Sequence, residues 1–193
     1  GSEKMSEIVN WKDRSVCVLF GDGAGAVVLK AVDNNTEDVT GDLVGHERGI
    51  IDSNIYNDGT GASVLTGGRR FSDSCSTDIF IHMDGQEVFK FDVKSVPTAI
   101  ETLLHNNNMD INDVDKFILH QANVRIIESV AKRLKADKDK FPVNLNEYGN
   151  TSSASIPILL DELNRNGSLK QGDKLILAGF GAGLSWGSIL LVW

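Results

Sequence analysis

The chain has 193 residues, of which 41% are hydrophobic and 24% charged, proportions that are ordinary for a soluble globular protein. No stretch approaches the ~18 apolar residues of a membrane-spanning helix, and nothing at the N-terminus resembles a secretory signal peptide, so we expect a cytoplasmic protein without a membrane partner. The net charge of −8 argues against general nucleic-acid binding, and two widely separated cysteines, Cys17 and Cys75, fit a reducing compartment.

A glycine-rich turn separates two predicted strands near the beginning of the chain. The apolar run from Val16 to Phe20 predicts a strand, Gly21 to Gly25 a turn, and Ala26 to Val32 a second strand. Residues 33 to 78 are polar and rich in Gly, Asn and Asp, and the only strand we predict there covers Gly49 to Tyr56. Long irregular segments of this kind are uncommon in compact domains.

Helical spacing of apolar residues begins at Val88 and continues to His105, where we expect Pro97 to break or kink the helix. Lys116 to Leu119 predicts a strand. The next predicted helix covers Val124 to Leu134, and its apolar face consists of Val124, Ile127, Val130, Ala131 and Leu134.

The remaining elements continue the alternation. We predict a strand from Phe141 to Leu145 and a helix from Thr151 to Asn164, which Gly167 closes as the residue after the C-cap. Two final strands, Lys174 to Ala178 and Ser188 to Val192, flank a glycine-rich turn. Alternating strands and helices indicate an α/β sheet with parallel pairs.

One pattern occurs twice. Phe20-Gly21-Asp22-Gly23 and Phe180-Gly181-Ala182-Gly183 each lie between two apolar runs. A full strand–helix–strand–helix unit precedes the second copy, whereas the first follows only about twenty residues, fewer than the ~30 of one βαβ unit. We therefore expect an N-terminal half-domain to be missing from this chain.

Two familiar motifs are matched by letters only, and metal-ligand spacing is not matched at all. The Gly-x-Gly-x-Gly turns at Gly21 and Gly179 lead into β-prone residues, whereas a dinucleotide fingerprint opens a helix. The Gly-x-Ser-x-Gly pattern around Ser185 is followed by no histidine, so we reject a hydrolase elbow. His46, His82, His105 and His120 show no metal-ligand spacing with each other or with the cysteines, and we expect no metal.

Two polar residues each follow a predicted strand and precede a helix, where α/β proteins bind ligands. His120 alone could be structural or catalytic, and Asn150 alone could be a helix cap. Together they offer two neutral hydrogen-bond donors to one substrate oxygen, which a developing enolate or thioester oxyanion requires.

Four segments carry a family resemblance, in order over essentially the whole chain. They resemble the glycine turns, histidine segment and asparagine segment of β-ketoacyl-acyl-carrier-protein synthase III. The segments are Phe20-Gly21-Asp22-Gly23-Ala24-Gly25-Ala26, His120-Gln121-Ala122-Asn123-x-Arg125-Ile126-Ile127, Gly149-Asn150-Thr151-Ser152-x-Ala154-Ser155-x-Pro157 and Gly179-Phe180-Gly181-Ala182-Gly183-x-x-Trp186-Gly187.

The resemblance implies an α/β thiolase-like fold, layered α-β-α-β-α and usually homodimeric, of which this chain is the C-terminal half plus the end of the N-terminal half. Residues 1–32 would be the tail of the first half, 33–80 a polar connection, and 81–193 the second half. The family condenses an acyl-CoA primer with malonyl-acyl carrier protein, initiating fatty acid synthesis, and uses no cofactor.

Residue roles follow from the same resemblance. His120 and Asn150 would stabilise the enolate formed when malonyl loses CO₂, and the turn Gly181-Ala182-Gly183 would supply a backbone N–H to the thioester oxyanion. Ala182 keeps that N–H but would disfavour a positive φ. CoA and acyl carrier protein would contact Asn123, Arg125, Gly85, Phe89, Lys90, Lys132 and Arg133, although the charges alone also fit an ordinary solvated helix face.

Neither cysteine occupies the position of the family's nucleophile, which lies upstream of the first glycine turn. We therefore expect this chain to be inactive alone. Priming by another acyl group in a specialised pathway and a non-catalytic structural fragment both stay open. A thiolase would use a second cysteine near the glycine turn, and plant-type polyketide synthases lack the His-Gln-Ala-Asn segment.

Overall fold

The computed structural model describes residues 1–31, 48–67 and 79–193, and its centre is a four-stranded sheet in the order β3-β8-β7-β6. β6 and β7 are parallel, as the alternation of strands and helices predicts, whereas β8 runs antiparallel to both β7 and β3. Two short antiparallel pairs, β1–β2 and β4–β5, lie outside the sheet. The strands are β1 (Ser2–Glu3), β2 (Gly23–Ala24), β3 (Gly49–Asn57), β4 (Leu65–Gly67), β5 (Ile81–Met83), β6 (Lys116–Leu119), β7 (Lys174–Gly181) and β8 (Ser185–Val192).

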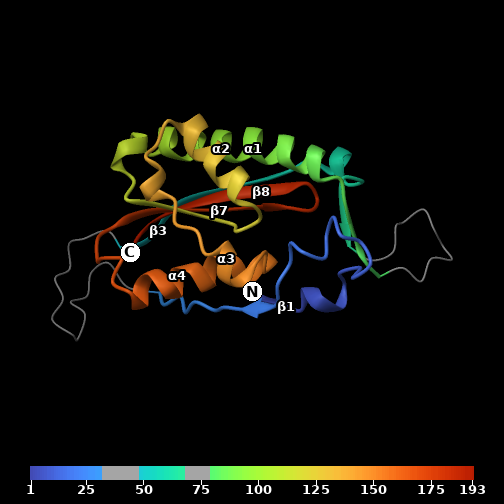
Figure 1. Ribbon diagram of the computed structural model, residues 1–193. Coiled ribbons are helices and arrows are strands. Elements are labelled where there is room, and N and C mark those ends of the chain that lie inside the picture. The colour runs from blue at the N-terminus through green and yellow to red at the C-terminus, as the bar shows by residue number, and fades with distance from the viewer. Residues whose placement is uncertain (32–47, 68–78) are drawn as a thin grey trace.

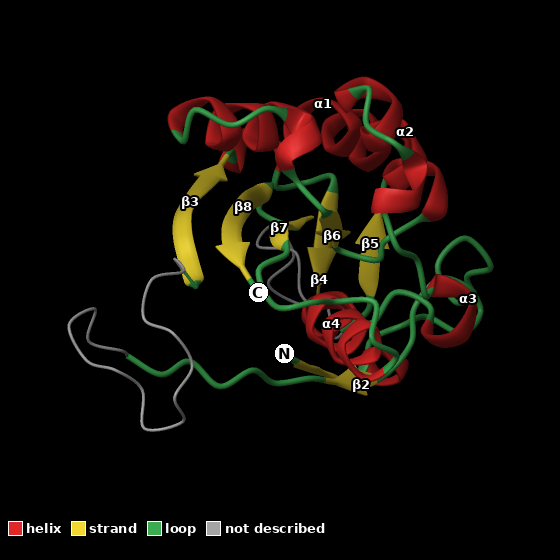
Figure 2. Cartoon of the chain, turned by 90° about the vertical axis from the view of Figure 1, so that its left-hand side faces the viewer, coloured by secondary structure: helices red, strands yellow, loops and turns green. Residues whose placement is uncertain are grey.

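Helices cover both faces of this sheet (Figures 1 and 2). α1 (Gly85–Asn106) and α2 (Val124–Leu134) pack on one face, and α4 (Ser155–Arg165) lies on the other, preceded by the short α3 (Leu145–Tyr148). Single 3₁₀ turns occur at Met5–Glu7, Gly59–Gly61, Ile111–Asp113, Lys138–Lys140 and Ser152–Ala154. No helix in the described ranges is both long and apolar enough to cross a membrane.

The sheet separates two hydrophobic cores because successive strand residues point to opposite faces. Phe117 and Leu119 of β6 pack with α1 and α2, and Ile118 between them packs with α4. β7 continues the alternation, with Ile176 in the first core and Leu175 in the second. All five side chains are at most 1% exposed, so these two strands are buried on both faces.

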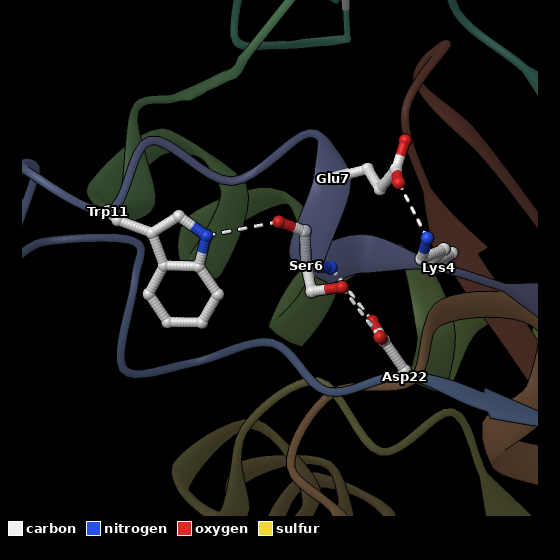
Figure 3. A network of polar contacts seen from close by, with 5 residues as sticks. All are labelled: Lys4, Ser6, Glu7, Trp11 and Asp22. Carbon is white, nitrogen blue, oxygen red and sulfur yellow. Dashed lines mark hydrogen bonds and ion pairs between the residues drawn. The ribbon is translucent and has the colours of Figure 1, made fainter.

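The N-terminal segment runs across α4 on the side away from the sheet (Figure 1). A polar network holds it together (Figure 3): Ser6 donates from its backbone N and its Oγ to the carboxylate of Asp22, at 2.7 and 2.6 Å. Trp11 Nε1 donates to the Ser6 carbonyl at 3.0 Å. The Gly21–Gly25 turn is thereby fixed against the first residues of the chain.

Two predicted strands in this segment are wrong. Val16 to Phe20 forms successive turns, in which the amides of Val16 and Cys17 donate to the Asp13 carbonyl, and only Phe20 makes a single parallel bridge, to Asn150. Ala26 to Ala31 is irregular, and Val32 lies outside the described residues. A strand needs a neighbour for its amides, and β1 reaches only Gly23 and Ala24. Consequently four apolar side chains are 59 to 94% exposed, namely Val18, Val27, Val28 and Leu29.

The first alternative predicted for Pro97, a break, is wrong, since α1 continues through it; the second, a kink, stays a prediction. Proline removes the N–H that would bond the carbonyl four residues earlier. Here the guanidinium of Arg133 on α2 reaches that carbonyl, on Val93, at 3.5 Å. Pro97 itself is buried against the core, so tertiary packing and a replacement donor keep the helix intact.

Other boundaries differ in detail. Strands at 49–57, 116–119, 174–181 and 185–192 confirm four predictions, and Gly167 follows α4 with a positive φ of 75°. Phe141 to Leu145 forms no strand, because Phe141 is anchored in the core against Phe117 and Pro142 lacks an amide donor. On α2, Val124 is 43% exposed, and Ile126 takes its place on the buried face.

Candidate active site

A cavity of about 430 Å³ lies where the parallel strands β6 and β7 end. His120 follows β6, Gly181 ends β7 and Ala182 follows it, so all three reach the same edge of the sheet. The wall is completed by α1, by the N-terminal segment and by the loop that contains Asn150. The structure therefore brings together the two residues that the sequence pairs, although Asn150 follows α3 rather than the predicted strand.

His120 is fixed from two sides. Its backbone N donates to the Ala178 carbonyl at 2.8 Å, and its Nδ1 lies 2.7 Å from Oγ of Ser155, the first residue of α4. The ring of Phe180 meets the imidazole edge to face, with centroids 5.2 Å apart. Burial among these groups lowers the pKa of His120 to about 4, so the imidazole is neutral at physiological pH.

Asn150 is fixed by its backbone and by its side chain. Its N–H donates to the Leu19 carbonyl at 2.8 Å, and its carbonyl accepts from the Gly21 N–H at 3.0 Å. Its Oδ1 accepts from the Ser152 N–H at 2.9 Å. Since that oxygen is occupied, the amide Nδ2 is the group left to donate toward a ligand.

The glycine turn after β7 offers a further donor. Within the described part of the chain, the Ala182 N–H donates to no protein acceptor, and Gly181 and Ala182 both line the cavity. The positive φ falls on Gly183, at 140°, rather than on Ala182. Alanine at 182 is thus compatible with the turn, while Gly183 itself does not line the cavity.

The cavity wall also carries an unpaired carboxyl group. Asp92 on α1 is 1% exposed, and its Oδ1 has no hydrogen-bond partner in the described structure. Burial raises its pKa to about 8, so the group is neutral at pH 7. The other buried side-chain atom without a partner in the described ranges, Thr66 Oγ1, belongs to the same wall.

The remaining predicted site residues divide into two groups. Gly85, Phe89 and Asn123 line the cavity, although the Asn123 side chain also caps α2 by accepting from the Arg125 N–H at 2.8 Å. The basic residues are exposed on the outer surface of α1 and α2 and do not line it: Lys90, Arg125, Lys132 and Arg133.

No cysteine among the described residues lines the cavity. Cys17 is partly buried and absent from its wall, and Cys75 lies outside the described residues. No group of three or more His, Cys, Asp or Glu side chains that could hold a metal ion occurs within residues 1–31, 48–67 and 79–193.

Sequence reasoning missed Asp92, Phe180 as the ring partner of His120, and the role of Ser155. Ser155 was visible only as part of the asparagine segment. A charged residue on the buried face of the helix over 88–105 was the available signal for Asp92, because such residues are rarely buried without function or pairing.

Comparisons with known proteins agree along the chain. Residues 1–59 match the family model described as 3-oxoacyl-[acyl-carrier-protein] synthase III, and residues 104–193 match the model for its C-terminal part. The chain is 44% identical to the β-ketoacyl-[acyl-carrier-protein] synthase III of Clostridium tetani, covering 100% of this chain and 58% of that protein. It is 46% identical to that of Vesicomyosocius okutanii, covering 99% and 56%.

Solved structures that resemble this chain carry names of the same kind. The 3-oxoacyl-[acyl-carrier-protein] synthase III of Aquifex aeolicus superposes with a TM-score of 0.86 at 40% identity, over 100% of this chain and 56% of the other. A priming β-ketosynthase from the R1128 polyketide pathway gives 0.78 at 30% identity, over 99% and 55%. The chain spans a little more than half the length of these relatives.

Proposed function

The chain belongs to the β-ketoacyl-[acyl-carrier-protein] synthase III family of the thiolase superfamily, and we propose that it carries the decarboxylation half of that family's active site. The reaction would join an acyl-CoA primer to malonyl-acyl carrier protein with loss of CO₂. The observation that supports this proposal is that His120, Asn150 and the Ala182 N–H share the wall of one cavity.

Two neutral donors suit the chemistry of decarboxylation. When the bond between the malonyl carboxylate and its α-carbon breaks, CO₂ leaves and the electron pair moves onto the thioester carbonyl as an enolate. Donors from His120 and Asn150 would stabilise the negative oxygen, and removing one such donor typically costs about 10²–10³ in rate. Because Asp92 is neutral at pH 7, it is no anion that would repel the malonyl carboxylate.

The carbon–carbon bond forms in the second step. The enolate carbon attacks an acyl group held as a thioester on a cysteine, the carbonyl oxygen becomes an oxyanion, and the thiolate then leaves. The Ala182 N–H would donate to that oxyanion. The chemistry uses electrons of the substrates alone, so we propose that no cofactor or metal takes part.

We propose that the nucleophilic cysteine lies outside this chain and that the chain alone is inactive. The described cavity wall contains no cysteine. The exposed side chains of Val27, Val28 and Leu29 fit a surface that further sheet would cover. A complete enzyme would be a cytoplasmic homodimer. A structural fragment without catalytic partners is the alternative, and a stable monomer in light scattering would favour it.

The exposed basic residues are proposed to dock the acidic carrier protein. Arg125 stands at the beginning of α2, beside the cavity-lining Asn123. In a complete enzyme, Arg125→Glu should weaken use of the carrier protein far more than acylation by acyl-CoA. Arg165→Glu, a charge reversal on α4 across the sheet, is the matched control. If Arg125→Glu lowered the use of the carrier protein and the acylation by acyl-CoA equally, a docking role for Arg125 would be refuted.

Acetylation is the decisive test. This chain, and the gene product extended upstream, would each be incubated with acetyl-CoA and weighed intact by mass spectrometry. We expect one acetyl group on a cysteine of the extended protein and none on this chain. Acetylation of Cys17 or Cys75 in this chain would refute the assignment of the nucleophile.

Since a relative named as a priming synthase of a polyketide pathway is 30% identical, a panel of longer acyl-CoA primers would distinguish a specialised pathway from fatty acid synthesis.

A further inference from the structure

The neutral imidazole of His120 can present either of two different groups to a ligand. If the proton is on Nε2, the ring offers an N–H donor; if it is on Nδ1, Nε2 offers a lone pair and acts as a base. Nδ1 contacts Ser155, and Nε2 has no hydrogen-bond partner in the described part of the chain. The tautomer therefore decides which chemistry His120 performs.

The hydroxyl of Ser155 has one proton and two acceptors within reach. Nδ1 of His120 is 2.7 Å from Oγ, and the Ser152 carbonyl is 2.9 Å away. The Ser152 carbonyl already accepts from the backbone N–H of Ser155, whereas Nδ1 has no other donor among the described residues. Ser155 Oγ can therefore donate to an unprotonated Nδ1 while the Ser152 carbonyl keeps its backbone donor; in the alternative arrangement an Nδ1–H donates to Oγ and the hydroxyl donates to the Ser152 carbonyl.

A second contact fixes the lone pairs of the same hydroxyl. The backbone N–H of Gln121 donates to Ser155 Oγ at 3.2 Å. Gln121 is fully buried and held in turn, because its Nε2 donates to the Leu119 carbonyl at 2.8 Å and its Oε1 accepts from the Asn144 N–H at 3.2 Å. The hydroxyl therefore has a fixed donor on one side, and its proton is free to point at the imidazole.

We infer that Ser155 is a positioning residue, whose hydroxyl donates to Nδ1 of His120 and holds the ring as the Nε2–H tautomer. The partner on one ring nitrogen sets the proton on the other. The same short turn orients Asn150, because the Ser152 N–H occupies its Oδ1 at 2.9 Å. The turn at Ser152–Ala154 and the first residue of α4 thus orient the side chains of both His120 and Asn150.

The tautomer can be read in this chain without any ligand. In ¹⁵N NMR of histidine-labelled protein at pH 7, His120, assigned by its loss in His120→Gln, should show a pyrrole-like Nε2 and a pyridine-like Nδ1. Ser155→Ala should shift both nitrogens toward a mixture of tautomers. Ser153→Ala is the matched control, since its hydroxyl bonds Glu3 instead. A protonated Nδ1 in the unmodified chain would overturn the inference, whether or not Ser155→Ala folds.

The catalytic consequence rests on the proposed function and is measured separately. In the upstream-extended protein, Ser155→Ala should lower kcat for malonyl-thioester decarboxylation by up to about 10²-fold, with little change in KM, as the loss of an oxyanion donor does. Absence of condensation by the unmodified extended protein would refute the proposed function while the NMR result for Ser155 stood. If the extended protein carries out condensation while Nδ1 of His120 is protonated, the proposed function stands and the inference about Ser155 is refuted.

Discussion

The buried carboxyl group of Asp92 should make the stability of this protein depend on pH in a way that Asp92→Asn abolishes. In the folded chain its pKa is about 8, against an ordinary value of 3.8. Below pH 4 both the folded and the unfolded states are protonated. As the pH rises, the unfolded state releases the proton and the folded state keeps it, so the free energy of unfolding falls until pH 8.

The size of this effect follows from the gap between the two pKa values. Each pH unit in the window costs about 1.4 kcal/mol, which sets an upper limit of roughly 6 kcal/mol across about four units. Local rearrangement and entering water reduce it, and we expect a few kcal/mol. Asparagine has nearly the same shape without the titration, so Asp92→Asn should match the parent near pH 4 and be more stable at pH 8.

Urea denaturation followed by circular dichroism from pH 4 to 9 measures the difference between the two proteins. Taking the difference cancels the titration of all other groups. Asn164→Ala changes an exposed residue of α4 that carries no titratable group, so it should give a difference that is independent of pH. A flat difference for Asp92→Asn as well would refute the reasoning, because it would mean that the buried group is ionised or hydrated in the folded state.

Two other changes test the fold and the site. His120→Gln should remove a loss of stability between pH 6.5 and 4, since the unfolded histidine gains a proton in that window while the folded one, with its lowered pKa, does not. Denaturation midpoints that fall equally in both proteins would contradict this. Arg133→Ala should cost about 1 kcal/mol by leaving the Val93 carbonyl without its donor, and the cost should vanish when Pro97→Ala restores the amide. Additive effects in that double-mutant cycle would exclude the compensation.

The elements that the sequence predicts best are those whose pattern has a single interpretation. Phe117, Ile118 and Leu119 form such an apolar run, and they become a strand because β7 pairs with them and both faces are buried. Val16 to Phe20 has the same local pattern but no neighbouring strand, and pairing is a property of the fold rather than of the run. Phe141 likewise has strand propensity, and its stacking on Phe117 decides its place.

The candidate site divides in the same way. His120 and Asn150 were predictable because both belong to the family segments; only His120 follows a strand, whereas Asn150 follows the short helix α3. The roles of Ser155 and Asp92 were not predictable in this way. Ser155 acts through its contact with His120, which lies 35 residues away in the sequence, and Asp92 stands out because its buried carboxyl oxygen has no hydrogen-bond partner among the described residues. Pro97 failed as a helix breaker because its replacement donor, Arg133, lies on another helix.

The paired hydrogen bonds between Asn150 and the chain around Phe20 have a practical consequence. The backbone N–H of Asn150 donates to the Leu19 carbonyl, and the backbone N–H of Gly21 donates to the Asn150 carbonyl. Neither N–H can exchange with solvent deuterium unless the two segments separate. Their protection factors, which correct each exchange rate for its residue type, should therefore be equal, and they report the free energy at which the N-terminal segment undocks. Because Asn150 is also a catalytic candidate, the same two amides would measure the free energy of opening the active site itself.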